Sequence, residues 1–249
     1  MSEMPGSRTI SSPLNRRLIL EKAIQLLDRD GLQGLTMRKL GDLLEVEAMA
    51  IYHYYNGRED LLDAIVDHLV AGVRVEPGSV VGERDGWQPY VQALARRVRQ
   101  MALDHPQAFP LVATRHPAAP WLRPPLRSLD LAEDLLAAMR ARGLTRPQAV
   151  HIYRVVTGFL LGHLMLEAST KAQTLVPDES LGQGDPAAAP DPEHRSSANA
   201  GPGTRPHPTI DDLEPLLRNH DPDVEFDASL EGLLDRLERE LTQTGLLHG

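Results

Sequence analysis

The side chains best suited to chemistry lie in one short stretch, Ile51-Tyr52-His53-Tyr54-Tyr55-Asn56-Gly57-Arg58. Three of the five tyrosines of the chain fall within these positions. A phenol has an apolar ring and a polar hydroxyl, so it can pack against a helix and still hydrogen-bond to a phosphate. The cluster therefore predicts a contact with nucleic acid. The alternative is an aromatic plug between small helices, and Tyr55 by itself is expected to pack inward.

The elements that must position this stretch are two short helices joined by a tight turn. Thr36 is expected to cap the first helix, 36–44, and a second helix fits 47–53. This is the arrangement of a helix-turn-helix motif, whose second helix enters the major groove while the first crosses the backbone. The residues expected to contact DNA are Glu47, Ala48, Met49, Tyr52 and His53 on the second helix, Arg38 at a base edge, and Thr36, Lys39, Tyr54 and Arg58 at phosphates.

Helical periodicity continues through the rest of the chain, without the alternation typical of strands. Further helices are expected from Ser12-Pro13 to Gly31 and over 58–73, 87–103, 107–114, 124–142, 145–169, 210–219 and 224–244. The segment 74–86 is rich in glycine and proline and marks a boundary. We therefore expect an all-α chain with a three-helix helix-turn-helix domain at 12–73 and a larger helical domain at 86–249. Within the larger domain, the proline-rich segment 174–208 is expected to be a flexible loop.

Composition restricts the class of protein further. The net charge is −9, but residues 1–58 hold eight basic and seven acidic side chains, so this segment is not acidic like the rest. The absence of cysteine excludes disulfides and cysteine-based zinc sites. We recognise neither a secretory signal nor an uninterrupted run of about 18 apolar residues, and therefore expect a cytoplasmic protein that does not bind membranes.

The stretch LTMRKLGDLL-EVEAMAIYHYYNGREDLLDAI closely resembles the DNA-binding domain of TetR-family transcriptional regulators. The resemblance covers about residues 14–70 and includes the glycine that ends the first helix, Gly31. It departs in the turn, where the family usually carries glycine and this chain has Glu45. The resemblance implies a homodimer that binds a pseudo-palindromic operator on double-stranded DNA.

The C-terminal part is similar to the tetracycline-repressor branch of that family. GFLLGHLMLEAS at 158–169, a long polar loop, and FDASLEGLLDRLE at 226–238 follow the order of that branch. The resemblance implies a ligand-binding and dimerisation domain, in which the helices 145–168 and 224–244 of both subunits form a four-helix bundle. Gly158 and Gly162 would allow a close helix approach, or serve only local packing.

The predicted ligand site combines apolar walls with a few polar groups, the usual composition of a small-molecule site. Its candidates are His105, Phe109, Val112, His116, Trp121, Tyr153, Phe159 and His163. For His105 the alternative is a helix-end residue that interacts with the helix dipole, and for the others it is ordinary core packing. The effector is an unknown small molecule, and neither a cofactor nor a metal is expected.

These resemblances predict a repressor that a small-molecule ligand releases from its operator, and two other classes of function are the alternatives. An enzyme is disfavoured because the chain lacks G-x-S-x-G, H-E-x-x-H and phosphate-loop motifs. A dimeric helical binding protein without operator binding is the second alternative, and the acidic charge and Glu45 favour it. A DNA-binding protein would differ from it by losing duplex affinity as salt rises.

Overall fold

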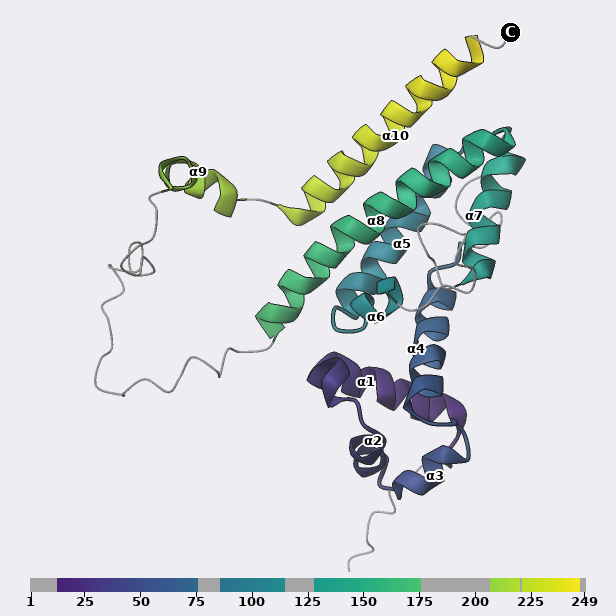
Figure 1. Cartoon of the computed structure of the whole chain (residues 1–249), viewed down its shortest axis with the longest axis vertical. Coiled ribbons are helices and arrows are strands. Elements are labelled where there is room, and N and C mark those ends of the chain that lie inside the picture. Colours follow the sequence, from purple (N-terminus) through teal and green to yellow (C-terminus); the bar gives the residue numbers. More distant parts are fainter. Residues whose placement is uncertain (1–12, 76–85, 115–127, 176–206, 220, 247–249) are drawn as a thin grey trace, which may run out of the picture. The chain divides into compact units, whose positions relative to one another are not determined.

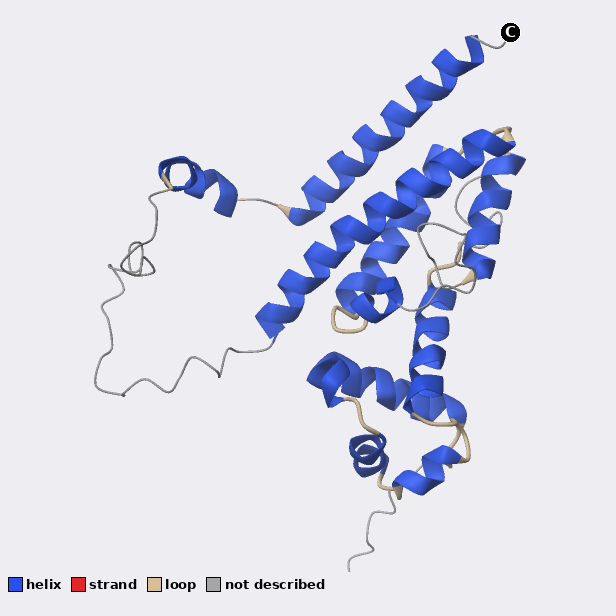
Figure 2. Ribbon diagram, in the orientation of Figure 1, coloured by secondary structure: helices blue, strands red, loops and turns tan. Residues whose placement is uncertain are grey.

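The computed structural model describes residues 13–75, 86–114, 128–175, 207–219 and 221–246. Every regular element in these ranges is a helix, which confirms the predicted all-α class (Figures 1 and 2). The helices are α1 (Arg16–Gly34), α2 (Met37–Leu44), α3 (Ala48–Tyr52), α4 (Arg58–Gly72), α5 (Gln88–Asp104), α6 (Phe109–Thr114), α7 (Leu129–Ala141), α8 (Arg146–Leu175), α9 (Pro208–Arg218) and α10 (Pro222–Leu246).

The start of α1 differs from the sequence expectation. Asn15, not Ser12, is the N-cap, and its side-chain oxygen accepts a hydrogen bond from the backbone N–H of Leu18 at 2.9 Å. The regular helix is broken at Gly31 as predicted, because this residue has φ +70°. The carbonyl of Gly31 then accepts the backbone N–H of Leu35 at 3.3 Å, and this bond directs the chain towards α2.

Helices α1 to α4 form a small bundle in which α1 packs against α2 and α4, and α2 packs against α3. Figure 1 shows α4 extending from this group towards the layer that contains α5 to α7. The core of the α1 to α4 bundle consists of apolar residues that share helical faces: Ile19, Ala23, Leu26, Leu27, Leu35, Leu40, Ile51, Tyr55, Leu61, Leu62, Ile65 and Val66. The three-helix domain and its connecting helix thus form around one core.

Helix α8 provides much of the core beyond α4. Its buried residues, Ala149, Ile152, Tyr153, Val156, Leu160, Leu164 and Ala168, recur at helical spacing. Although its sequence is apolar on nearly every side, which favours burial all round, the helix is not fully buried in the single chain. Its opposite face exposes Gly158, Gly162 and Leu166, and Leu166 is 74% exposed.

The apolar composition of α8 also bears on the membrane expectation. By length and composition alone, its residues Arg146–Ala172 could cross a membrane. A core helix of a water-soluble protein passes the same test, and α8 contributes a continuous row of buried side chains to a helical core. Core packing therefore explains the apolar sequence.

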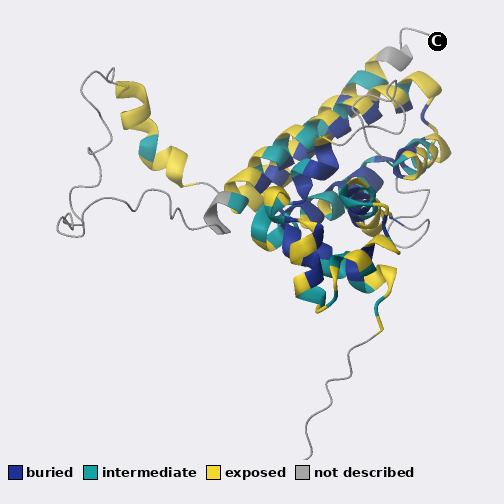
Figure 3. Ribbon diagram, turned by 60° about the horizontal axis from the view of Figure 1, so that its bottom comes forward, coloured by how far each residue is buried: buried dark blue, intermediate teal, exposed yellow. Residues whose placement is uncertain are grey.

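The chain divides into two compact units, with the division between Ala172 and Gln173. The second unit contains α9 and α10. Helix α10 has a stripe of buried residues, Phe226, Leu230, Leu234 and Leu237, whereas α9 has no buried residue (Figure 3). Most of the predicted flexible loop, residues 176–206, lies outside the described residues.

Candidate functional site

The turn between α2 and α3 determines how the two helices of the predicted DNA-binding motif meet. Glu45 adopts the left-handed conformation, with φ 56° and ψ 37°, and is the non-glycine residue with positive φ in the described part of the chain. The backbone N–H of Val46 bonds to the carbonyl of Gly41 at 3.0 Å. A β-carbon on Gly41 would lie 2.8 Å from the carbonyl oxygen of Val46, so glycine permits the close approach here.

The first turn of α2 presents three of the predicted DNA contacts. Thr36 caps the helix as expected: its hydroxyl oxygen accepts the backbone N–H of Lys39 at 3.2 Å, which leaves the hydroxyl proton for a phosphate. Arg38 is exposed, as a residue that reaches a base edge must be. The ammonium of Lys39 lies 3.1 Å from Asp30, and hydrogen bonds from Arg29 and Lys39 lower the pKa of the Asp30 carboxyl to about 2.

Helix α3 exposes most of the residues predicted to meet base edges. Met49 is 68% exposed and Tyr52 45% exposed, and Glu47 and His53 are also exposed, whereas Ala48 is half-buried. Ile51, by contrast, is fully buried and fixes the helix on the core. Helix α3 thus presents an exposed apolar side chain, Met49, and an exposed phenol, Tyr52, on one short element.

The tyrosine cluster separates into two roles. The hydroxyl of Tyr54 donates to the carbonyl of Leu14 at 2.8 Å, and that of Tyr55 donates to the carbonyl of Arg16 at 2.9 Å. Each hydroxyl has one proton, so the predicted phosphate contact of Tyr54 is corrected: its hydroxyl binds the start of α1 instead. Tyr55 packs inward as expected, under the guanidinium of Arg16, and burial raises its pKa. Tyr52, whose side chain is exposed, remains a predicted phosphate contact.

Arg58, which was also predicted to contact a phosphate, has a structural role in this domain. Its guanidinium donates to the carbonyl of Leu35 at 2.9 Å and to the carbonyl of Leu32 at 2.6 Å. These carbonyls lie where α1 ends, so Arg58 ties the start of α4 to the connection between α1 and α2. No local sequence pattern indicates this contact, because the partners are more than 20 positions away.

The predicted ligand-site residues are found in different environments. Phe109, Val112 and Tyr153 are buried, and burial raises the pKa of Tyr153 to about 12. The rings of Phe159 and His163 pack together with centroids 5.4 Å apart. His116 and Trp121 lie outside the described residues.

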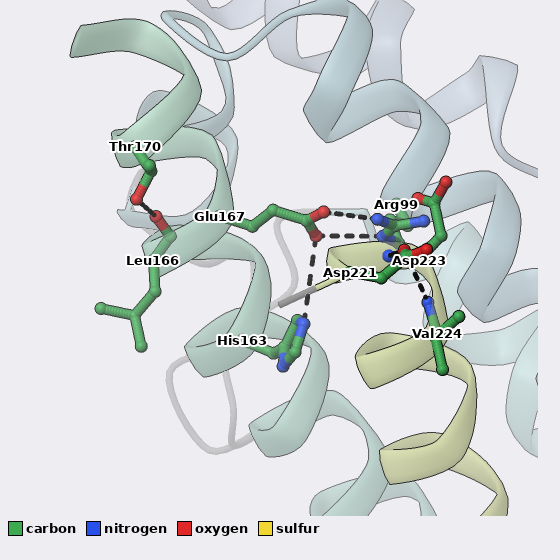
Figure 4. Close-up of polar contacts among 8 residues, drawn as sticks. All are labelled: Arg99, His163, Leu166, Glu167, Thr170, Asp221, Asp223 and Val224. Carbon is green, nitrogen blue, oxygen red and sulfur yellow. Dashed lines mark hydrogen bonds and ion pairs between the residues drawn. The ribbon is translucent and has the colours of Figure 1, made fainter. Parts of the chain in front are cut away.

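A polar cluster that sequence reasoning missed lies beside His163. The guanidinium of Arg99 on α5 makes two hydrogen bonds to Glu167 on α8, one of them at 3.0 Å, and both side chains are 13% exposed (Figure 4). The Nε2 atom of His163 lies 4.0 Å from the same carboxylate (Figure 4). A shielded pair of this kind holds a fixed charge arrangement next to the aromatic rings of the predicted site.

His105 lies elsewhere, at the end of α5. Its Nδ1 atom is 2.8 Å from a carboxylate oxygen of Asp28 on α1. The same imidazole lines a pocket of about 350 Å³ together with His68, Leu69, Gly72, Val73, Arg97, Gln100, Met101 and Asp104. The other predicted ligand residues in the described part of the chain do not line this pocket, so these described residues do not form one site around His105. Among the described residues, no group of three His, Asp or Glu side chains is arranged to hold a metal ion.

Comparison with known proteins identifies both parts of the chain. Residues 19–65 match the family model of bacterial regulatory proteins of the tetR family, and residues 82–241 match that of the tetracyclin repressor-like C-terminal domain. An HTH-type transcriptional regulator of Saccharopolyspora erythraea is 30% identical over 170 residues, 68% of each protein. The class D tetracycline repressor protein of Escherichia coli is 27% identical over 172 residues, 68% of this chain and 75% of that protein.

A solved structure supports the same assignment. The crystal structure of a possible TetR family transcriptional regulator from Streptomyces coelicolor A3(2) is 28% identical and has a TM-score of 0.65 over 90% of this chain and 99% of that one. These relatives are regulators and not enzymes. The chain therefore belongs to the TetR family of DNA-binding transcriptional regulators and carries a C-terminal domain of the tetracycline-repressor type.

Proposed function

We propose that this regulator acts in the cytoplasm as a homodimeric repressor that binds a pseudo-palindromic operator and is released by a small molecule. The observation that carries the proposal is the exposed surface of α2 and α3, held by the turn at Glu45 and Gly41. Two such surfaces related by a two-fold axis would meet successive major-groove faces of one duplex.

The side chains on this surface suit different parts of DNA. Arg38 has the guanidinium that matches the O6 and N7 atoms of guanine, and Met49 offers an apolar contact of the kind that a thymine methyl group accepts. The hydroxyls of Thr36 and Tyr52 suit phosphates, which position the protein without reading sequence. Tyr54 and Arg58 contribute indirectly, because they hold α1 and α4 in place behind the reading helices.

The exposed face of α8 supports dimerisation. Gly158 and Gly162 have open space around the positions where a β-carbon would lie, and Leu166 is 74% exposed. Small residues beside a large exposed apolar one suit close packing against another helix. We propose that α8 and α10 of each subunit form the interface of the dimer, as in the branch that the C-terminal domain resembles.

The effector is proposed to bind among the aromatic side chains of the C-terminal domain near Phe159 and His163. The Arg99–Glu167 pair beside them supplies fixed charges, and an effector with a polar group would need such a partner inside an apolar site. To release the operator usefully, the effector must prefer the non-binding conformation by a few kcal/mol.

The proposal is tested first by selecting duplexes from a random DNA pool with the purified protein and no added ligand. An enriched inverted repeat would support a dimeric sequence reader and supply the operator for effector screening. Failure of a folded dimer to enrich any sequence would contradict repression by the ligand-free protein.

The dimer surface is tested separately by sedimentation. Leu166→Glu places a charge on the exposed face of α8 and should give monomers. Leu129→Glu is the matched control, since Leu129 is also a large exposed apolar residue, 47% exposed, but belongs to α7 and not to α8. If both variants stay dimeric, the proposed interface is wrong.

A further inference from the structure

The contact between His105 and Asp28 joins the two functional parts of the protein. Asp28 lies on α1, inside the DNA-binding bundle, and His105 caps the end of α5 in the ligand-binding domain. Their polar atoms are 2.8 Å apart, although the residues are 77 positions apart in the chain. The chain itself connects the bundle to the ligand-binding domain through α4, so this contact is a second, non-covalent connection.

The surroundings of the pair favour a positive charge on the imidazole. The second carboxylate oxygen of Asp28, Oδ1, is buried and has no hydrogen-bond partner among the described residues. A carboxylate that has lost its water on one oxygen is costly unless an opposite charge lies beside it. The Asp28 side chain is 26% exposed and the His105 side chain 29% exposed, so water screens their attraction only in part.

The other charged groups around the imidazole are few. Asp104 precedes His105 on α5, His68 faces the shared pocket from α4, and Arg97 faces it from α5. Asp104 adds to the attraction, and the hydrogen bond with Asp28 is the largest cause that raises the pKa of His105, against the opposing effect of burial. Helix α6 begins after His105 with Phe109 and presents no charged side chain in its described residues.

Close packing next to the pair makes the contact sensitive to position. Gly31, three residues after Asp28 on α1, lies against Gln107, whose side-chain oxygen would be 3.4 Å from a β-carbon at that position. The segment that follows His105 therefore touches α1 at a second point. The backbone N–H groups of Ala108 and Phe109 both bond to the carbonyl of His105, which holds the start of α6 close to the end of α5. A displacement of α5 or α6 would therefore move both contacts together.

We propose that the His105–Asp28 contact is a protonation-sensitive latch that holds the DNA-binding bundle against the ligand-binding domain and favours the operator-binding arrangement. This inference rests on the proposed function, in which the ligand-free protein binds the operator. Protonated His105 makes a charge-assisted hydrogen bond, which is roughly twice as strong as a neutral one. Folding raises the pKa of His105 above the ordinary pKa that it has in the unfolded chain. The stabilisation is therefore complete at pH values below the unfolded pKa and is lost as pH rises through the higher pKa of the folded protein.

The test measures operator affinity at about pH 6 and about pH 8.5 at constant ionic strength, a range over which histidine changes charge. The probe is the duplex that the wild-type protein enriches from a random pool. His105→Asn keeps an N–H donor near the position of Nδ1 but cannot titrate, and Asp28→Asn removes the negative charge. His68→Asn is the matched control, because it removes a histidine from the same pocket without touching the latch.

The expected result is a comparison of affinity ratios between variants, because any pH dependence from groups outside the latch and its pocket is common to all of them. The ratio of affinities at low and high pH should be about fivefold larger for the wild type and His68→Asn than for His105→Asn and Asp28→Asn, near the lower end of allosteric coupling. Equal ratios in all four proteins would overturn the latch.

A nuclear magnetic resonance titration of the His105 ring in the wild-type protein gives a readout that needs no operator. The pKa of the His105 ring should lie above the ordinary pKa of histidine, and Asp28→Asn should return it to that ordinary value. Titration at the ordinary value overturns the proposal even if a variant fails to fold. If the selection yields no operator while the ring titrates high, the proposed repression fails but the contact itself stands.

Discussion

Replacing Gly41 by alanine tests the geometry of the helix-turn-helix most sharply. The new β-carbon would lie 2.8 Å from the carbonyl oxygen of Val46, 3.2 Å from the backbone nitrogen of Ala48 and 3.4 Å from its α-carbon. These are backbone atoms at the start of α3, so no flexible side chain can move aside. Overpacking of this kind costs about 1–3 kcal/mol.

The helix propensity of alanine opposes this cost. Alanine is better than glycine inside a helix by about 1 kcal/mol. The expected net effect of Gly41→Ala is therefore a loss of about 0–2 kcal/mol in the free energy of unfolding. The shifted α3 should also weaken operator binding, because its exposed residues would no longer meet the groove at the same angle.

Gly72→Ala provides the matched control. Gly72 is the last residue of α4, and a β-carbon there meets no atom of the described chain within 4 Å. This variant should be as stable as the wild type or more stable by up to about 1 kcal/mol. The assay is urea unfolding at one fixed protomer concentration, since the stability of a dimer depends on concentration. If Gly41→Ala is as stable as Gly72→Ala, the close contact between α2 and α3 does not exist.

Three further predictions concern the reading surface. Tyr52→Phe should weaken operator binding by about 1 kcal/mol without changing stability, whereas Tyr54→Phe should reduce stability by about 1 kcal/mol, because the Tyr54 hydroxyl bonds to the carbonyl of Leu14. Titration calorimetry and urea unfolding of both variants separate the two roles, and the opposite pattern would show that the roles are exchanged. Arg38→Ala should cost about 1–3 kcal/mol and relax the preference at one base pair per half-site; a uniform loss across all base substitutions would instead make Arg38 a phosphate contact. Glu45→Gly should raise stability by about 1 kcal/mol, because glycine adopts the left-handed conformation without strain, and it should tighten DNA binding by removing a negative charge. Unchanged stability in urea would show that the turn is not strained.

The sequence was a good guide to the fold where local signals and periodicity agree. The all-α class and the membership of the TetR family are confirmed, and Thr36 and Gly31 perform the capping roles that their positions predicted. Helix ends were less accurate at α1, because Asn15 competes with Ser12 as a cap and only the tertiary structure decides between them.

The candidate site was less predictable because sequence spacing does not show where a side chain points. Tyr52 is the last residue of α3, whereas Tyr54 lies beyond the end of that helix and its hydroxyl bonds to the distant Leu14. The roles of Arg58, Arg99 and Asp28 depend on partners far along the chain, which no local pattern reveals. The apolar sequence of α8 likewise does not distinguish a fully buried helix from one that keeps an exposed face for a second subunit.

The central claim is that the exposed surface of α2 and α3 reads double-stranded DNA. The most direct measurement is the affinity of the wild-type protein for its enriched duplex and for a scrambled duplex of the same composition over a series of salt concentrations. The account predicts preference for the enriched duplex and a loss of affinity as salt rises, with a logarithmic slope of roughly −0.9 per phosphate contacted. Equal affinity for both duplexes, or affinity that does not depend on salt, would contradict it.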